Sequence, residues 1–283
     1  MKTHWIFNED QSIYHLGLRS DQVADFVFTV GDPGRVPMIS RLFDTIETKI
    51  GSREFVTHTG SIGLKRVSVL STGIGTDNMD IVLNELDALW NLERNFMERR
   101  KQPVSATIIR LGTTGAIQPD LEVDSILISE AAIGLDALGS FYKMKENIQS
   151  DYWKEQFSKH GLKFHLYFTT PDQSLLNRFN VSNFSKGICL TSPGFYIPQG
   201  RSSFADSFYP NLLNLLSDMR TFDQKRISNI EMETSGLYGL GNLLGHQCLS
   251  VNAILANRCN DQFSKNPEHT IQKMIEKVFD ILF

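Results

Sequence analysis

The sequence predicts an α/β protein with a single domain, in which helices flank a central mixed, largely parallel twisted sheet. Along its 283 residues, short apolar runs typical of buried strands alternate with longer amphipathic segments typical of helices. Such alternation is characteristic of a sheet covered by helices. No Pro/Ser-rich linker, repeat or low-complexity stretch interrupts it. We therefore expect one domain over residues 1–283, large enough to bury a substantial core.

The expected strands are short apolar runs, and the expected helices show apolar residues at helical spacing. The strands cover residues 26–30, 55–59, 67–71, 107–111, 125–131, 164–168, 187–190 and 248–254. The helices cover residues 35–43, 78–97, 152–160, 207–217, 234–244 and 267–282. The last helix has the clearest pattern, because Asn266 can cap it, Pro267 suits its first turn and an apolar stripe continues to Leu282.

Composition narrows the class of function. A net charge of −4 argues against nucleic acid as a partner, since binding its phosphates requires clustered Lys and Arg. Three unpatterned cysteines predict no disulfide framework and favour a cytoplasmic location. The N-terminus lacks the apolar core of a signal peptide, and the most apolar stretch, residues 237–255, contains several polar side chains. We expect neither membrane attachment nor a catalytic metal, since no metal-binding motif is present.

Two glycine loops that carry an arginine follow expected strands. Residues 31–35 place Arg35 after the first strand, and residues 110–115 place Arg110 beside Gly112, Thr113, Thr114 and Gly115. Ligands of α/β sheets lie at the carboxyl ends of strands, where glycine permits close approach and arginine supplies a permanent charge. Each loop alone can be a turn with a surface arginine. Together they predict a phosphate site built from distant parts of the chain.

Further motifs follow in order along nearly the whole chain. They are residues 15–18, 31–35, 52–55, 71–75, 110–118, 195–196 with Gln199 and Arg201, 231–233 and 257–258. In these motifs and their order the sequence resembles the nucleoside phosphorylase family, of the purine/uridine phosphorylase type. The resemblance implies a single α/β domain, phosphate as co-substrate and no organic cofactor. Residues 1–12 then form an N-terminal extension. Two further segments, residues 90–104 and 259–266, are insertions that vary in the family, and we expect the first of them to lengthen a helix.

The resemblance implies a phosphate clamp and a ribose site. The phosphate-binding residues are Gly31, Arg35, Arg53, Arg110 and Thr113, and the ribose-binding residues are His15, Thr113, Met232 and Glu233. A carboxylate can bind both vicinal hydroxyls of a ribose, which suits Glu233, although an acidic residue also favours the start of a helix. Arg53 has no glycine loop of its own, so its assignment depends on the resemblance alone.

The base site implied by the resemblance matches the uridine-specific members. It comprises Thr114, Gly115, Phe195, Gln199, Arg201, Glu231 and Arg258. An aromatic face can stack on uracil, while a glutamine amide offers a donor and an acceptor to its O2/N3 edge. Arg201 can then bind O4, where charge gathers as the base leaves. Purine-specific relatives carry an aspartate that protonates the purine near the position of Arg258, so we expect little activity on purines.

We therefore expect reversible phosphorolysis of uridine to uracil and α-D-ribose 1-phosphate, with Arg110, Gln199 and Arg201 as the catalytic residues. A broader pyrimidine nucleoside phosphorylase, a related nucleosidase and a catalytically silent nucleoside-binding protein remain the alternatives. The resemblance also implies that His15 and Arg53 are lent to a partner subunit, so that a homodimer is the minimal unit and a hexamer stays open. Glu54 and Ile74 match residues that hold a monovalent cation between subunits in some bacterial relatives. The third residue of that site is a serine in the family, and Asn78 stands at its position here.

Overall fold

Eleven strands form one mixed sheet in the computed structural model of the chain, which describes residues 5–93, 95, 97–145, 148–181, 183–221 and 223–283. The strands of this sheet are β1 (Phe26–Val30), β2 (Thr45–Ser52), β3 (Phe55–Ile62), β4 (Lys65–Ser71), β7 (Thr107–Ala116), β8 (Ile126–Gly134), β9 (Tyr167–Thr169), β10 (Ser185–Thr191), β11 (Ile227–Glu231), β12 (Gln247–Asn257) and β13 (Gln262–Phe263). A separate hairpin joins β5 (Leu92–Glu93) to β6 (Glu98–Arg99).

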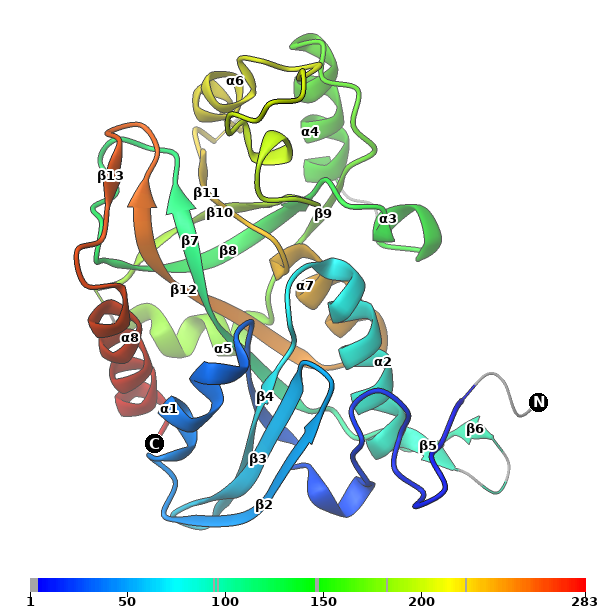
Figure 1. Ribbon diagram of the computed structural model, residues 1–283. Helices are drawn as coiled ribbons and strands as arrows, with labels where there is room; N and C mark the ends of the chain where they lie inside the picture. The colour runs from blue at the N-terminus through cyan, green and yellow to red at the C-terminus, as the bar shows by residue number, and fades with distance from the viewer. Residues whose placement is uncertain (1–4, 94, 96, 146–147, 182, 222) are drawn as a thin grey trace.

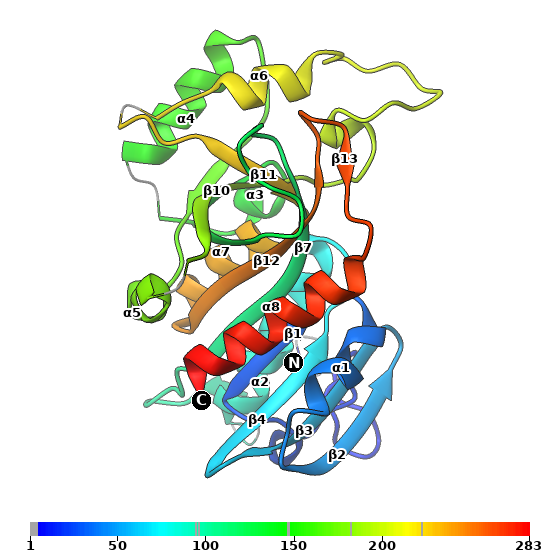
Figure 2. The ribbon, with the colours of Figure 1, turned by 90° about the vertical axis from the view of Figure 1, so that its left-hand side faces the viewer.

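The helices are α1 (Val36–Ser40), α2 (Thr76–Asn91), α3 (Leu138–Phe141), α4 (Ile148–Lys159), α5 (Gln173–Arg178), α6 (Leu212–Asp218), α7 (Thr234–Leu244) and α8 (Pro267–Leu282). In Figure 1, α2 and α7 lie side by side on one face of the sheet. Figure 2 shows α8 crossing the other face, with α1 beside it. The sheet is thus covered on both faces, as the alternation of strands and helices predicted.

Strand β7 is shared by two parts of the sheet. On one side it continues in parallel to β1 and β4, after which β3 and β2 run antiparallel to the edge. On the other side β7 pairs with β12, and the chain of pairings β12–β8–β10–β11 returns to β7 and closes a ring. Because β7 belongs to both parts, its side chains lie where the loops of the other strands converge.

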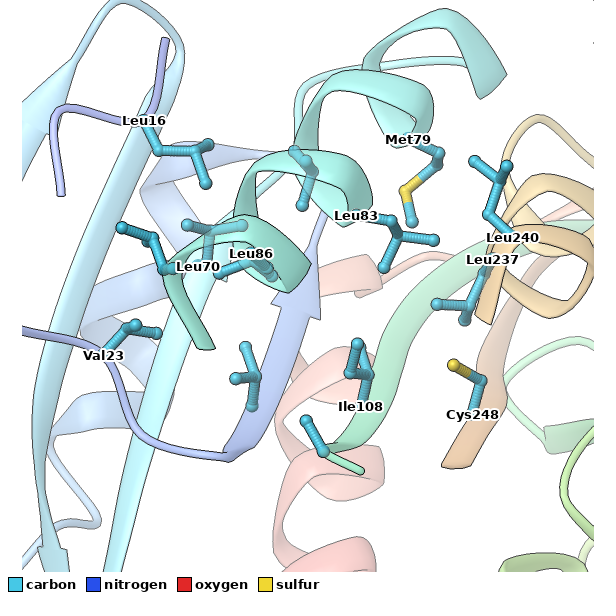
Figure 3. Close-up of a cluster of buried hydrophobic side chains, with 14 of the residues drawn as sticks. Leu16, Val23, Leu70, Met79, Leu83, Leu86, Ile108, Leu237, Leu240 and Cys248 are labelled. Atoms are coloured by element: carbon cyan, nitrogen blue, oxygen red, sulfur yellow. The ribbon is translucent and has the colours of Figure 1, made fainter. Parts of the chain in front are cut away.

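The core is divided between the two faces of the sheet. Along β1, Phe26, Phe28 and Val30 pack with α1 and α8, whereas Val27 packs with α2 and α7, because successive side chains of a strand point to opposite faces. In the cluster of side chains between the sheet and helices α2 and α7, Leu83 of α2 lies near Leu237 of α7 and Ile108 of β7 (Figure 3). A strand that is apolar on both sides is therefore explained by burial on both faces.

Several expected elements are confirmed at both ends. Strand β1 and helices α7 and α8 have the predicted bounds. Asn266 caps α8 by accepting a hydrogen bond from the backbone N–H of His269 at 3.3 Å. The stripe predicted for α8 is buried down to Leu282.

The expected lengthening of a helix by residues 90–104 is wrong. Helix α2 ends at Asn91, not at Met97, and the chain turns back through the β5–β6 hairpin; residues 94 and 96 lie outside the described part. The Asn91 side chain explains this end, because its oxygen accepts from the N–H of Val104 at 2.6 Å and its nitrogen donates to the carbonyl of Val104 at 3.1 Å. These bonds tie the returning chain to the end of the helix.

Other differences arise where pairing with distant strands decides the structure. The predicted strand at residues 107–111 continues to Ala116, because its second half pairs with β12 and β11. Strands β2 and β11 and helices α3 and α5 were not predicted; β2 is mostly exposed and polar, so it lacks an apolar run. Helix α6 begins at Leu212 rather than at residue 207, and β9 covers Tyr167–Thr169 rather than 164–168.

Candidate active site

A cavity of about 650 Å³ opens where β1, β4, β10 and β11 end beside the second half of β7. It gathers most of the residues predicted from the sequence, namely Gly31, Arg35, Arg110, Thr113, Thr114, Gly115, Phe195, Gln199, Arg201, Glu231, Met232 and Glu233. Further lining comes from Asp32, Pro33, Gly73, Ile74, Ile230, Leu255, Ala256 and Phe263. His15, Arg53 and Arg258 do not line it.

Arg110 lies in the wall of the cavity, in the middle of β7, and is 4% exposed. Its Nη1 donates to Oδ1 of Asn252 at 3.2 Å, and its Nη2 donates to Oε2 of Glu233. The carboxylate of Glu231 lies 3.7 Å from the same Nη2. Burial alone would lower the pKa of Arg110, but the two carboxylates outweigh it and raise the pKa. The guanidinium is therefore a permanent cation held from two sides.

Gly112 provides the space that this guanidinium occupies. A Cβ at this position would lie 1.6 Å from Nη1 of Arg110 and 2.5 Å from Oδ1 of Asn252. The register of the sheet sets Gly112 opposite Asn252 on β12. The glycine of the sequence motif is thus required by a side chain that folds back over its own strand.

Arg35 supplies a second positive charge at the same end of the cavity. It is half-buried, and burial followed by the charge of Arg110 lowers its pKa. Its guanidinium has no hydrogen bond or ion pair with any residue that the structure describes, although Arg110 is close enough to repel it. Two such cations, one without a partner, favour an anion between them. The loop of Gly31 and the hydroxyl-bearing Thr113 line the same region.

Glu233 is the N-cap residue of α7, and its carboxylate contacts Arg110 directly. Its Oε1 accepts a hydrogen bond from the backbone N–H of Gly75 at 2.7 Å. Burial raises the pKa of Glu233, and Arg110 opposes this shift. Met232 lies next to it in the lining, so a carboxylate and an adaptable apolar side chain meet at one place.

Glu231 also lines the cavity, but the protein already engages its carboxylate. Oε1 accepts from the hydroxyl of Thr191 at 2.7 Å, and Oε2 accepts from the backbone N–H groups of Glu233 at 2.9 Å and Thr234 at 3.0 Å. These bonds fix the first turn of α7. Glu231 therefore holds the start of α7 in place, and its expected contact with a base remains a prediction.

Another part of the cavity lining, formed by Phe195, Gln199 and Arg201, is aromatic and amphipathic. The guanidinium of Arg201 lies 4.1 Å from the ring centroid of Phe195, and Phe195 is 51% exposed. Gln199 is buried, and its side-chain amide has no hydrogen bond to the described residues. Burial lowers the pKa of Arg201. A planar ligand with polar edges fits this combination of an aromatic face, an amide and a cation.

Arg258 is brought to this loop from behind rather than into the cavity. Its Nη1 donates to the carbonyl of Gln199 at 2.7 Å and its Nη2 to that of Gly200 at 3.2 Å. The side chain predicted to contact the base therefore holds the backbone that carries Gln199. Two like charges face each other here, since Arg201 contributes to a lowered pKa of Arg258 after burial.

His15 and Arg53 lie together on another part of the surface. The Arg53 guanidinium lies 5.2 Å from the ring centroid of Tyr14, whose ring is 4.8 Å from that of His15. Ser52, next to Arg53, donates to the carbonyl of His15 at 2.7 Å. We call His15, Tyr14 and Arg53 the N-terminal patch. The fold brings the two predicted residues together but leaves them outside their own chain's cavity.

The residues of the predicted cation position are also neighbours. Nδ2 of Asn78 lies 3.4 Å from Oε1 of Glu54, and Ile74 is exposed. The amide thus donates to the carboxylate that a cation would otherwise neutralise. Among the described residues, no group of three or more His, Cys, Asp or Glu side chains is arranged to hold a metal.

Several residues of the site were not predicted from the sequence, and Phe263 and Asn252 are the most informative of them. Phe263 on β13 lines the cavity from residues 259–266, which were expected to be a variable insertion. Its only signal was a single aromatic residue within a polar stretch. Asn252 contacts Arg110 but lies 142 positions away in sequence, and a buried asparagine within an apolar strand was its only signal.

Known proteins match nearly the whole chain. The family model described as the phosphorylase superfamily matches residues 25–282. The uridine phosphorylase of Thermococcus kodakarensis is 32% identical over 274 residues, which are 97% of this chain and 88% of that one. The uridine phosphorylase of Haemophilus influenzae is 27% identical over 95% of each chain. A Trypanosoma brucei nucleoside phosphorylase, described as showing uridine phosphorylase activity, superposes with a TM-score of 0.86 at 26% identity over 98% of each chain.

Within the described ranges, no helix of the protein is both long and apolar enough to cross a bilayer.

Proposed function

The chain belongs to the phosphorylase superfamily, and on that basis we propose that it catalyses the reversible phosphorolysis of uridine. The products are uracil and α-D-ribose 1-phosphate, which makes the enzyme a pentosyltransferase. One observation carries the proposal: Arg35, without a partner in the described chain, lies close to the buried Arg110 in a cavity that is also lined by the aromatic ring of Phe195. A phosphate at one end and a pyrimidine at the other place the ribose between them.

The reaction needs no nucleophile from the protein, because phosphate itself attacks. Arg35, Arg110 and Thr113 hold the phosphate against C1′ of the ribose, while Glu233 binds the ribose hydroxyls. The C1′–N1 bond stretches to an oxocarbenium-like sugar, as in glycoside cleavage, and a phosphate oxygen forms the new bond from the opposite face. The bonding electrons leave with uracil, whose N1 then takes up a proton from solvent, and phosphate releases one proton as its ester forms. Gln199 and Arg201 stabilise the resulting anion, and each such donor contributes about 10²–10³ in rate.

Phosphate and ribose meet at the pair formed by Arg110 and Glu233. Before binding, each satisfies the charge of the other in the buried wall. Phosphate offers oxygens to Arg110, and the ribose offers hydroxyls to Glu233. The two substrates together therefore replace the contact between Arg110 and Glu233 by one contact of each residue with a substrate. Catalysis here rests on positioning and electrostatics, with phosphate as co-substrate and no organic cofactor.

The test is release of uracil from uridine with and without phosphate. Phosphate-dependent release, with α-D-ribose 1-phosphate as the second product, supports the proposal. Equal release without phosphate would identify a nucleosidase, and no release would identify a silent binding protein. Thymidine in parallel separates a broader pyrimidine phosphorylase, and inosine should be a poor substrate. Gln199→Ala and Arg201→Ala should both lose most of the uridine activity, since a site built for polar edges leaves buried groups unpaired.

We also propose that the active site is composite and that a homodimer is the minimal unit. The N-terminal patch supports this, because His15 and Arg53 both lie against the ring of Tyr14, outside the cavity of their own chain. In the proposed dimer each subunit lends both residues to the other, His15 to the ribose 5′-hydroxyl and Arg53 to the phosphate. A two-fold interface makes the exchange reciprocal.

Complementation between two inactive variants tests the composite site. Arg53→Ala and Arg110→Ala homodimers should both be nearly inactive, whereas a mixed dimer has one site lacking both arginines and one intact site. Random reassociation in equal amounts makes about half of the dimers mixed, so about a quarter of the wild-type activity should return. Mass spectrometry verifies that mixed dimers form. Inactivity of verified mixed dimers would show that Arg53 does not serve the partner's site.

A further inference from the structure

Glu85 is a buried carboxylate that the proposed mechanism does not use. It lies on α2, is 8% exposed and does not line the cavity of the active site. Its Oε2 accepts hydrogen bonds from the backbone N–H of His15 at 3.1 Å and of Leu16 at 2.9 Å. Its Oε1 lies 2.5 Å from Nδ1 of the His15 ring. One carboxylate thus holds both the backbone and the ring of His15.

These contacts determine which atom of the ring is free. A carboxylate accepts hydrogen bonds, so Nδ1 of His15 carries a proton and donates a hydrogen bond to Glu85. Nε2 is then the nitrogen left for a ligand, and the His15 side chain is 29% exposed. Within the described chain, His15 is the one ionisable side chain that pairs with Glu85. The buried carboxylate and the exposed ring therefore form a single unit.

We propose that Glu85 is the positioning residue of His15 and fixes the ring so that Nε2 meets the 5′-hydroxyl of the ribose. This inference rests on the composite site proposed above, in which that ribose belongs to the partner subunit. Glu85 touches no substrate and acts only through the ring. It sets the ring orientation before the ligand arrives, so that no rotamer freedom of His15 is lost on binding.

A purely structural role makes a different prediction. If Glu85 only ties residues 15 and 16 to α2, its removal loosens the N-terminal segment and lowers activity on every nucleoside to a similar extent. If Glu85 positions His15, its removal matters only for a substrate that carries a 5′-hydroxyl. The ratio of kcat/KM for uridine to kcat/KM for 5′-deoxyuridine separates the two roles, because any general loss of active enzyme cancels in it.

The experiment measures this ratio for the full-length wild type, for His15→Ala, for Glu85→Ala and for the double variant. One well-oriented hydrogen bond corresponds to a loss of about tenfold, and we expect both single variants to lower the ratio by this factor. The double variant should show no further fall, since both changes remove the same contact. Activity on 5′-deoxyuridine should stay near that of the wild type in all of them.

Asp80→Asn is the matched control. Asp80 lies on the same helix and, with Glu85 and His15, lines a separate pocket of about 310 Å³. It pairs with Tyr142 and with Asn84 at 3.1 Å, and it does not contact His15. Its substitution should leave the substrate ratio unchanged.

Three outcomes would overturn the proposal. If Glu85→Ala lowers activity on both substrates equally, Glu85 is structural. If His15→Ala lowers the ratio but Glu85→Ala does not, the positioning role fails while the composite site stands. If His15→Ala leaves the ratio unchanged, the assignment of His15 fails and this inference fails with it. Should Glu85→Ala not fold, Glu85→Gln keeps the shape but loses the charge-assisted bond, and we expect its ratio to fall roughly threefold; an unchanged ratio would also refute the positioning role.

Discussion

Substituting Gly112 with alanine should remove most of the phosphorolytic activity, although it deletes no polar group from the site. The added Cβ would lie 1.6 Å from Nη1 and 2.7 Å from Cζ of Arg110, far inside van der Waals contact. Strand β12 pairs with β7 at Gly112 itself, and β1 pairs with it up to Arg110, so the side chain of Arg110 must move rather than the backbone. It then loses Asn252 and Glu233 as partners and leaves its place in the phosphate site.

The size of the effect follows from the bonds at stake. A charge-assisted hydrogen bond contributes about 1.5–3 kcal/mol, so loss of two such bonds to phosphate costs about 3–6 kcal/mol. This corresponds to a fall of roughly 10²–10⁴ in kcat/KM. Arg110→Ala should lose roughly 10²-fold or more for the same reason. Glu233 also loses its cation in both variants, so we expect a lower Tm as well.

The assay is initial-rate release of uracil over a range of phosphate concentrations, with Tm measured on the same samples. Gly51→Ala on β2 is the control, since no atom lies within 4 Å of a Cβ built there. It should retain both activity and Tm. A Gly112→Ala variant that folds and keeps near-wild-type kcat/KM would show that Arg110 does not lie over Gly112 in the active enzyme.

Three further predictions test other parts of the structure. Arg35→Ala should mainly raise the KM for phosphate, by about tenfold or more, because one charge-assisted contact is lost; an unchanged KM would contradict the clamp. Arg258→Ala should raise the KM for uridine more than that for phosphate, since it frees the carbonyl of Gln199. Burial would raise the pKa of Asp87, but His246, whose Nε2 lies 3.3 Å from the carboxylate, and a hydrogen bond from Asn91 outweigh it and lower the pKa. Asp87→Asn should therefore be less stable than wild type at neutral pH, and this difference should vanish as the pH falls below about 4.

The sequence alone was sufficient for features that depend on local pattern. The apolar runs and stripes predicted β1, α7 and α8 because strand and helix periodicities are properties of neighbouring residues. Glycine loops with arginines indicated an anion site, since few side chains and backbones can approach a phosphate closely. The ordered motifs supplied the family, which the match over residues 25–282 confirmed.

Only the tertiary structure decided how distant residues meet. Glu233 follows Arg110 by 123 positions and Asn252 follows it by 142, and no local pattern shows that both reach one guanidinium. The ring of strands that extends β7 beyond Leu111 likewise exists only once β11 and β12 are in place.

The same holds for the direction in which a side chain points. Arg258 lies behind the loop that carries Gln199, and Phe263 reaches the cavity, whereas the resemblance placed Arg258 in the base site and residues 259–266 in a variable insertion. Periodicity and motif spacing describe which residue types are present and how far apart they lie along the chain. The charge pairs, the filled space above Gly112 and the separation of His15 from its own cavity arise from packing between elements, which is a property of the folded molecule.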